Sequence, residues 1–299
     1  MPSPTDDLGP PATLTPTEAV RQFSEAAGRP FTLVGRLPGG LTGAHLIRSP
    51  TGSEMVLKWV TGERSRRVRT AGAGFAERLR ADGGWPCPRH ELANTADWLF
   101  IAQEFMRGEP VTRVDAQLAD DILGLHDRQS GLARTSDSGD WAAHLLTTLT
   151  KGGETYCLHE PLRDHSRRTR RVVDMMTDFA SSLDAQSFPA PDVVHWDLHP
   201  GNVLQVDDRL TAVVDSDFAK VGDRNFDLLT FAIGCYELEC PKDVRDRLLG
   251  EATDRLDDTL RLAYCGHLMI RFLSWPVQSN DYAEIELWLD LADRLLRDL

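Results

Sequence analysis

Hydrophobic and polar residues follow different patterns in the two parts of the chain. Before residue 107, apolar side chains gather in short runs that are separated by turn-forming glycine, proline and serine. These runs cover 31–36, 44–48 and 54–59. Their spacing predicts a three-stranded antiparallel meander. One-sided apolar faces predict helices at 16–27 and 65–80, and a further apolar run covers 98–105.

After residue 107 the pattern becomes helical, because apolar residues recur every three or four positions over long segments. The predicted helices are 116–125, 141–149, 170–183, 225–236, 243–252, 257–275 and 281–296. Three shorter apolar runs lie among them, at 193–196, 203–206 and 212–214. They are too short for helices and predict strand fragments that support a loop.

These elements predict an α+β protein with two lobes. Residues 1–13 are rich in proline, threonine and aspartate and are expected to form a disordered tail. Residues 14–106 form the predicted N-terminal lobe, with a small antiparallel sheet, and residues 108–299 form a larger, mainly helical C-terminal lobe. The connection between them is placed at 103–107. A chain of 299 residues that is 41% hydrophobic can bury a core of this size.

Composition narrows the class of protein further. No window approaches the roughly 18 uninterrupted apolar residues that a membrane span needs, and the start of the chain lacks the features of a secretory signal, so a cytoplasmic location is expected. The five cysteines are odd in number and form no C-x-x-C pair, and the nine histidines lack metal-ligand spacing. Neither a disulfide framework nor a zinc site is expected.

The net charge of −13 is distributed unevenly. Residues 1–106 carry 12 basic and 11 acidic side chains, whereas residues 107–299 carry 21 and 35, a net charge of −14. Such a field repels nucleic acid and anionic membranes and attracts a polycationic ligand. A solvated acidic surface that keeps the protein soluble explains the same charge, so both interpretations stay open.

The strongest chemical signal is the segment 195–202, which reads His-Trp-Asp-Leu-His-Pro-Gly-Asn and is followed after a short hairpin by Asp215. Phosphoryl transfer needs a carboxylate that accepts the proton of the attacking hydroxyl, and oxygen ligands for Mg²⁺ that bridges the phosphates. Asp197 suits the first role. Asn202 and Asp215 suit the second.

This segment resembles the aminoglycoside phosphotransferase and choline kinase group, whose motif H-x-D-x-x-x-x-N matches His195, Asp197 and Asn202. The group's G-D-x-x-x-D-L segment matches residues 222–228. The resemblance covers roughly residues 30–235 and implies a two-lobed protein-kinase-like fold with ATP and Mg²⁺ as cofactors, GTP remaining an open alternative. Trp196 stands where protein kinases usually have arginine, and no long activation loop follows, so a protein substrate is not expected.

The resemblance also implies a nucleotide site in the N-terminal lobe. Gly40, Thr42 and Gly43 lie in a glycine-rich hairpin that would cover the phosphates. Lys58 ends an apolar strand and corresponds to the lysine that contacts the α- and β-phosphates. Glu77, on the following helix, is its expected ion-pair partner.

The expected hinge between the lobes follows the same resemblance. The Glu104 carbonyl and the Met106 N–H would bond the adenine edge, with Gln103 at the back of the base pocket. His195 is interpreted as a site residue that braces the loop by hydrogen bonds and does not shuttle protons. Asp223 and Asp227 are interpreted as structural supports, because they precede an apolar helix and suit capping positions.

The acceptor is inferred from charge. The acidic helical lobe favours an acceptor with several ammonium or guanidinium groups, such as an aminoglycoside or a cationic peptide antibiotic, and phosphorylation would then give resistance. Candidate lining residues are Asp217, Glu237 and Glu239. The alternative is a metabolic kinase for an amino alcohol or sugar, of the choline, homoserine, fructosamine or methylthioribose type. The arginine-rich segment 151–171 fits either an exposed basic helix face or an anion-binding guard of the cleft.

Overall fold

The computed structural model describes residues 14–37, 43–137, 139–153 and 156–296. The predicted tail at 1–13, together with Gly40 and Thr42, lies outside the described residues. The N-terminal part is a five-stranded antiparallel sheet in the order β1-β2-β3-β5-β4. Its strands are β1 (Thr32–Arg36), β2 (His45–Arg48), β3 (Glu54–Thr61), β4 (His90–Asn94) and β5 (Trp98–Glu104). The predicted meander is confirmed, whereas the short and polar β4 was not predicted.

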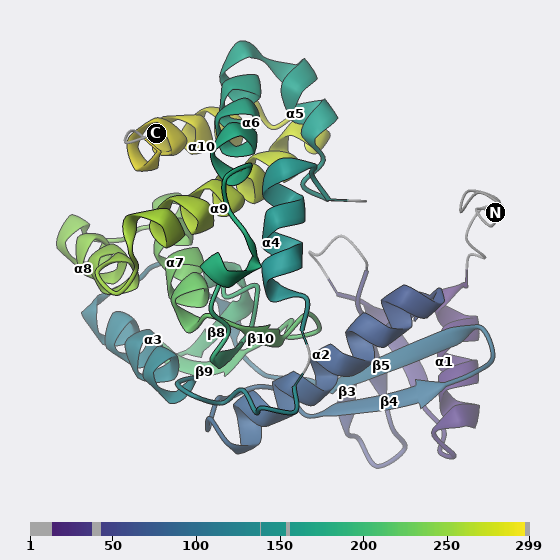
Figure 1. Cartoon of the computed structure of the whole chain (residues 1–299). Coiled ribbons are helices and arrows are strands. Elements are labelled where there is room, and N and C mark those ends of the chain that lie inside the picture. Colours follow the sequence, from purple (N-terminus) through teal and green to yellow (C-terminus); the bar gives the residue numbers. More distant parts are fainter. Residues whose placement is uncertain (1–13, 38–42, 138, 154–155, 297–299) are drawn as a thin grey trace, which may run out of the picture.

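The two faces of this sheet are covered by different helices. Helix α1 (Pro16–Ala26) places Phe23 with its ring centroid 6.2 Å from that of Phe100 of β5, in a buried cluster that also contains Leu57 of β3. Successive side chains of a strand point to opposite faces, so Lys58 and Gln103 point to the other face. Helix α2 (Glu63–Ala81) contacts that face and extends toward the helical region (Figure 1). The alternation thus aims both polar side chains at α2.

The C-terminal part consists mainly of helices around one large core. They are α3 (Ala116–Arg128), α4 (Trp141–Thr150), α5 (His159–His165), α6 (Arg167–Ala180), α7 (Arg224–Gly234), α8 (Lys242–Thr253), α9 (Asp258–Ser279) and α10 (Tyr282–Leu295). Each predicted helix is confirmed. Helix α5 was not predicted, because its short span gives no clear period. None of the described helices is long and apolar enough to cross a membrane.

Short strands within the helical part carry the loops of interest. β7 (Asp192–Val194) pairs with β10 (Lys220–Gly222), and β8 (Val203–Val206) lies between β6 (Glu109–Pro110) and β9 (Arg209–Val213). Three 3₁₀ turns complete the described elements: η1 (Ala185–Ser187), η2 (Pro200–Asn202) and η3 (Cys235–Glu237). The three predicted strand fragments correspond to β7, β8 and β9. The loop between β7 and β8 contains the motif singled out in the sequence.

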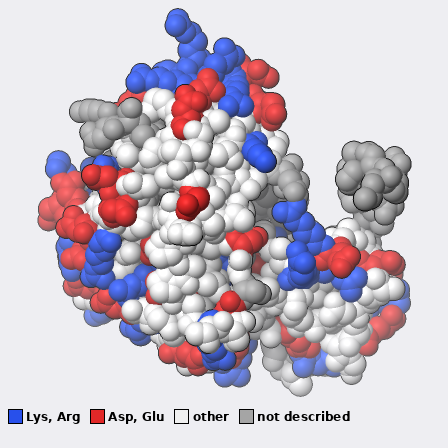
Figure 2. All heavy atoms as spheres, in the orientation of Figure 1, with Lys and Arg blue, Asp and Glu red and all other residues white. Residues whose placement is uncertain are grey.

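The arginine-rich segment 151–171 forms α5 and the start of α6. Figure 2 shows basic side chains gathered there, at the top of the view, with acidic side chains beside them. Arg168 forms ion pairs with Glu286, Asp290 and Asp293 of α10 at 2.6–2.8 Å. This solvent-exposed network joins α6 to α10, and exposed pairs of this kind contribute little stability each.

Helix α2 connects the two parts of the molecule. Ala76 and Leu79 belong to the large core of the helical part, although the helix also contacts the sheet. At Gly72 the helix backbone comes so close to the segment after β9 that an added Cβ would lie 2.1 Å from the Asp217 carbonyl oxygen. Only glycine allows this approach, so Gly72 sets the distance between α2 and that segment.

We expect Gly72→Ala to lower the free energy of unfolding by about 2 kcal/mol, because the new methyl group forces α2 away from Asp217. Gly74→Ala is the matched control. An added Cβ there meets nothing within 4 Å, and alanine should raise helix stability by roughly 0.5–1 kcal/mol. Urea unfolding of both variants measures the two effects, and equal changes in both would contradict this packing.

Candidate active site

The loop after β7 brings Asp197 and Asn202 together. The carbonyl oxygen of Asp197 accepts hydrogen bonds from the His199 N–H at 2.8 Å and from Asn202 Nδ2 at 2.9 Å. The Asn202 N–H in turn donates to the His199 carbonyl at 2.8 Å. The loop therefore turns back on itself, which explains why the aspartate and the asparagine are five positions apart.

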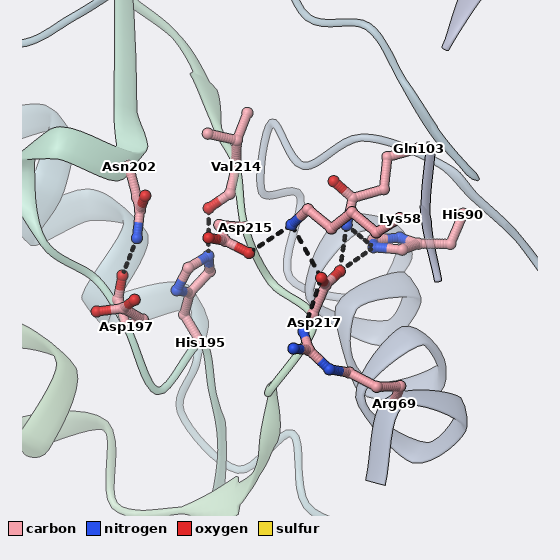
Figure 3. Close-up of polar contacts among 10 residues, drawn as sticks. All are labelled: Lys58, Arg69, His90, Gln103, His195, Asp197, Asn202, Val214, Asp215 and Asp217. Atoms are coloured by element: carbon pink, nitrogen blue, oxygen red, sulfur yellow. Dashed lines mark hydrogen bonds and ion pairs between the residues drawn. The ribbon is translucent and has the colours of Figure 1, made fainter. Parts of the chain in front are cut away.

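Asp215 reaches the same place from the end of β9. The Val214 N–H donates to the Asn202 carbonyl at 2.8 Å, and His195 Nε2 donates to the Val214 carbonyl at 3.0 Å. Asp215 itself has a left-handed backbone, with φ +63°, and its side chain is 42% exposed. Figure 3 shows the side chains of Asp197, Asn202 and Asp215 around His195. The two loops thus present three oxygen-bearing side chains together.

Buried groups support this loop from below. Asp227 of α7 accepts hydrogen bonds from the His195 N–H at 2.6 Å, the Trp196 N–H at 2.9 Å and Gln129 Nε2 at 2.7 Å. His195 is fully buried and stacks on Trp85, with ring centroids 6.1 Å apart. Its contacts are those of a bracing residue. Asp223 caps α7 by accepting from the Asn225 N–H at 2.9 Å.

A buried ion network joins the sheet to Asp215. Lys58 Nζ donates to Asp215 Oδ1 at 2.7 Å and to Asp217 Oδ2 at 2.9 Å. Asp217 also accepts from Arg69 Nη1 at 2.8 Å and from Gln103 Nε2. Gln103 Nε2 also donates to His90 Nε2 at 3.0 Å (Figure 3). β3, α2 and β5 therefore converge on one carboxylate.

The network holds its groups in their ionised forms. Burial acts to raise the pKa of Asp217, but the cations Lys58 and Arg69 outweigh it, and the pKa lies well below its usual value. Burial acts to lower the pKa of Lys58, but Asp217 and Asp215 outweigh it and raise that pKa. A charge buried here is stable only because an opposite charge lies beside it.

Two predictions about this region are wrong. Lys58 does not pair with Glu77, which instead accepts hydrogen bonds from Arg80 on the exposed side of α2. The helix presents Arg69 to the network, about 12 Å before Glu77 along its axis, and Asp217 supplies the carboxylate. Asp217 is also not a substrate-lining residue, because its side chain is 1% exposed and is bonded to three neighbouring groups.

The oxygen donors present fit Mg²⁺. The amide nitrogen of Asn202 donates to the Asp197 carbonyl, and its Oδ1 has no hydrogen bond to another described residue. The Asp215 carboxylate is 42% exposed. Among the described residues no three His, Cys, Asp or Glu side chains are grouped as a metal site. Mg²⁺ is usually held by one or two carboxylates together with substrate phosphates. Asn202 and Asp215 match this pattern.

Arg271 of α9 is a site residue that the sequence reasoning missed. Its Nη2 donates to Asp197 Oδ1 at 2.5 Å and its Nη1 donates to the Trp196 carbonyl at 2.8 Å. Burial acts to raise the pKa of Asp197, but Arg271, together with His195, His199 and Asn202, outweighs it, and the pKa falls below its usual value. The available signal was a single arginine inside the apolar run 268–273.

The proposed substrate side carries a carboxyl pair. Glu237 Oε2 lies 3.0 Å from His199 Nε2, next to the catalytic loop. Burial raises the pKa of Glu284 on α10, and the neighbouring Glu237 carboxylate raises it further. Glu284 was not predicted from sequence. Glu239 accepts a backbone hydrogen bond from the Val114 N–H at 2.9 Å, and none of the described side-chain contacts joins its carboxylate to the loop.

The remaining predicted nucleotide contacts lie at the edge of the sheet. Gly43 precedes β2 with φ +70°, a conformation that suits glycine. Glu104 ends β5, where its N–H donates to the Arg89 carbonyl at 3.0 Å, and Met106 follows in the segment that leads to Gly108. The roles of Glu104 and Met106 as a hinge stay predictions.

Comparison with known proteins adds a family and a fold. The sequence matches the phosphotransferase enzyme family over residues 34–264. No curated protein matches it in sequence. A thermostable mutant of aminoglycoside phosphotransferase APH(4)-Ia is similar in structure, with a TM-score of 0.67 and 15% identity over 93% of this chain and 98% of that chain. Another structure of a thermostable APH(4)-Ia mutant contains ADP and hygromycin B.

Other solved structures of the same fold have different names. Macrolide 2′-phosphotransferase MphH from Brachybacterium faecium has a TM-score of 0.54 and 17% identity, over 90% of this chain and 95% of that chain. A protein assigned as a fructosamine-3-kinase from Thermobifida fusca YX-ER1 has a TM-score of 0.57 and 19% identity, over 94% and 99%. At these identities the likeness shows the kinase-like fold, and it leaves the acceptor to be argued from the site.

We expect Asp217→Asn to lower the free energy of unfolding by about 3–5 kcal/mol, because it leaves two buried cations without their shared carboxylate. Glu77→Gln should change it by no more than about 0.5 kcal/mol, since that ion pair is exposed. Both substitutions remove one negative charge, so a difference between their free energies of unfolding in urea reports where the carboxylate lies and not the change in net charge. A larger loss from Glu77→Gln would show that the predicted Lys58–Glu77 pair matters after all.

Proposed function

The chain belongs to the phosphotransferase enzyme family, and from this premise we propose that it transfers the γ-phosphate of ATP to a hydroxyl of a polycationic antibiotic of the aminoglycoside type. Family membership and fold make it a kinase that acts on hydroxyl groups. The observation that carries the choice of acceptor is the Glu237–Glu284 carboxyl pair beside the catalytic loop.

Asp197 is the proposed catalytic base. Arg271 occupies its Oδ1, which leaves Oδ2 to accept a hydrogen bond from the acceptor hydroxyl. The carboxylate would orient this hydroxyl and take its proton as the bond to phosphorus forms. Mg²⁺ bound by Asn202 Oδ1 and Asp215 would offset the negative charge on the phosphates. Catalysis would then rest on positioning and electrostatics without a covalent enzyme intermediate.

The nucleotide would bind between the sheet and this loop. Lys58 donates to Asp215, so its ammonium already lies beside the proposed metal ligand, where it can contact phosphate oxygens. Gly43, with Gly40 and Thr42, would cover the phosphates. The segment 103–107 would bond the adenine edge through the main chain of Glu104 and Met106. In this proposal residues 14–106 form the nucleotide-binding lobe and residues 108–299 supply the catalytic loop and acceptor site.

The acceptor site is proposed on the side of the loop where His199, Glu237 and Glu284 meet. Burial raises the pKa of Glu284, and the neighbouring Glu237 carboxylate acts in the same direction because like charges repel, while the hydrogen bond from Trp288 opposes them. A bound ammonium group would offset this repulsion. Phe272 stacks on Trp288 with ring centroids 4.6 Å apart and also lies near His199, so an aromatic wall adjoins the acids. The net charge of −14 over residues 107–299 favours the same kind of acceptor.

A metabolic kinase is the second candidate. The fold likeness to a protein assigned as a fructosamine-3-kinase favours it, as does the small number of acids in the site, since one carboxyl pair also suits an acceptor with a single amine. An acceptor of the choline, homoserine, fructosamine or methylthioribose type would use the same catalytic residues.

We expect Asp197→Asn to reduce acceptor-dependent ADP release by about 10³-fold while ADP still binds, because the carboxylate acts on the acceptor hydroxyl. Asp215→Ala should weaken both magnesium-ATP binding and transfer. The assay uses magnesium-ATP and a panel of aminoglycosides, cationic peptide antibiotics, choline, homoserine, a fructosamine and methylthioribose. Near-normal turnover of Asp197→Asn would overturn the mechanism, and a response to uncharged or singly charged acceptors alone would favour the metabolic kinase.

We expect Glu237→Gln and Glu284→Gln each to raise KM for a polycationic acceptor by about tenfold, with ATP KM unchanged, because each removes a partner for ammonium groups. Glu286→Gln is the matched control. It lies on the same helix as Glu284, but its carboxylate pairs with Arg168 instead. An equal rise in KM for the control would show that the overall negative charge of the lobe, and not contact with these two carboxylates, determines acceptor binding.

A further inference from the structure

Arg271 is a single charged residue in the most buried stretch of α9. Leu268, Met269, Ile270 and Leu273 around it are fully buried, and the arginine side chain itself is 10% exposed. Placing a guanidinium in such surroundings is costly unless its donors are bonded. The helix supplies no partner for it. The partners come from the catalytic loop, 74 residues earlier in the chain.

The guanidinium holds two consecutive residues of that loop. One arm donates to the Trp196 carbonyl at 2.8 Å and the other donates to Asp197 Oδ1 at 2.5 Å. Asp227 accepts a hydrogen bond from the N–H of Trp196 at 2.9 Å. The peptide groups before and after Trp196 are therefore each fixed by a buried side chain, one from α7 and one from α9.

This double restraint explains the backbone of Trp196. The residue has φ +76°, in the left-handed region where a bulky side chain is disfavoured by about 1–2 kcal/mol. Its indole ring stacks on Phe226 with ring centroids 5.0 Å apart, and Lys220 Nζ and the Arg271 guanidinium lie 4.1 Å and 5.5 Å from the ring centre. These contacts hold a conformation that the residue would otherwise leave. That conformation directs the following side chain, which is Asp197.

We propose that Arg271 is a positioning residue for the phosphoryl transfer, fixing both the backbone before Asp197 and one oxygen of its carboxylate so that the other oxygen faces the acceptor. The inference rests on the proposed role of Asp197 as catalytic base. A guanidinium suits this task because it has two arms at a fixed angle. A lysine at 271 has a single ammonium and would not reproduce both bonds.

Three variants test this assignment: Arg271→Lys, Arg271→Ala and the control Arg261→Lys. Arg261 lies near the start of the same helix, where it pairs with the exposed Asp258 at 3.4 Å. Thermal unfolding and ADP affinity establish that each variant is folded. Steady-state rates are then measured with magnesium-ATP and the panel acceptor that gives Asp197-dependent ADP release in the wild type.

We expect Arg271→Lys to lower kcat by about 100-fold while ATP KM changes by less than about threefold, because the base is misplaced and the nucleotide site is intact. Guanidinium chloride, at concentrations far below those that unfold the protein, should raise the kcat of Arg271→Ala by about tenfold or more. Sodium chloride at equal ionic strength should not. Arg261→Lys should match the wild type.

The outcomes separate a positioning role of Arg271 from a structural role and from a failure of the proposed function. Wild-type kcat in Arg271→Lys, when Asp197→Asn is inactive, would overturn the role of Arg271 and leave the proposed function standing. A parallel loss of kcat and ADP affinity without guanidinium rescue would make Arg271 a structural residue only and would also overturn the inference. If Arg271→Ala does not fold, Arg271→Lys carries the test, since it keeps a cation in the core. Absence of any Asp197-dependent transfer by the wild type would remove the proposed function itself.

Discussion

The carboxylate of Asp217 lies in the dry interior where the sheet, α2 and the segment after β9 meet, and much of the site depends on it. Lys58, Arg69 and Gln103 all bond to this one side chain. An ionised carboxylate with 1% exposure persists only when cations and donors replace the water it has lost. The requirement fixes three elements relative to one another. It therefore also fixes Lys58 beside Asp215.

The catalytic loop is held by buried polar side chains on its other side. Asp227 accepts hydrogen bonds from two N–H groups of the loop, and Arg271 donates to a carbonyl and to the Asp197 carboxylate. Removing Arg271 would leave the Asp197 carboxylate without its cation, and removing Asp227 would leave two buried N–H groups unpaired, so the loop conformation and the two side chains stabilise one another. Such a pair of restraints allows a tryptophan to keep a left-handed backbone immediately before the proposed base. Preorganisation of this kind lets an enzyme position a reacting group without rearrangement during the reaction.

In the proposed function two groups of charged side chains face the two substrates. The Lys58–Asp217 group is buried and lies toward the nucleotide, where Lys58 would contact a phosphate. The carboxyl pair of Glu237 and Glu284 is different, because its charges repel and are only partly compensated by His199 and Trp288. A pair of neighbouring carboxylates that a cation stabilises would give selectivity for an amine-bearing acceptor. The choice between a polycationic antibiotic and a smaller amine then depends on how many further ammonium groups the surrounding acids accept.

The sequence by itself determined the elements and the identity of the main chemical groups. The periods of the apolar residues located the long helices and the meander, and the five-residue spacing of Asp197 and Asn202 indicated a catalytic loop, because these signals lie within short windows of the chain. Short or polar elements such as β4 and α5 carry too little period to be recognised.

Only the tertiary structure decided which charges pair. Glu77 was expected to hold Lys58, yet Asp217 does so from 159 residues away, and Arg271 reaches Asp197 across 74. The physical reason is that a buried ion is satisfied by whatever opposite charge the packing brings beside it, and packing of distant segments is not encoded in local spacing.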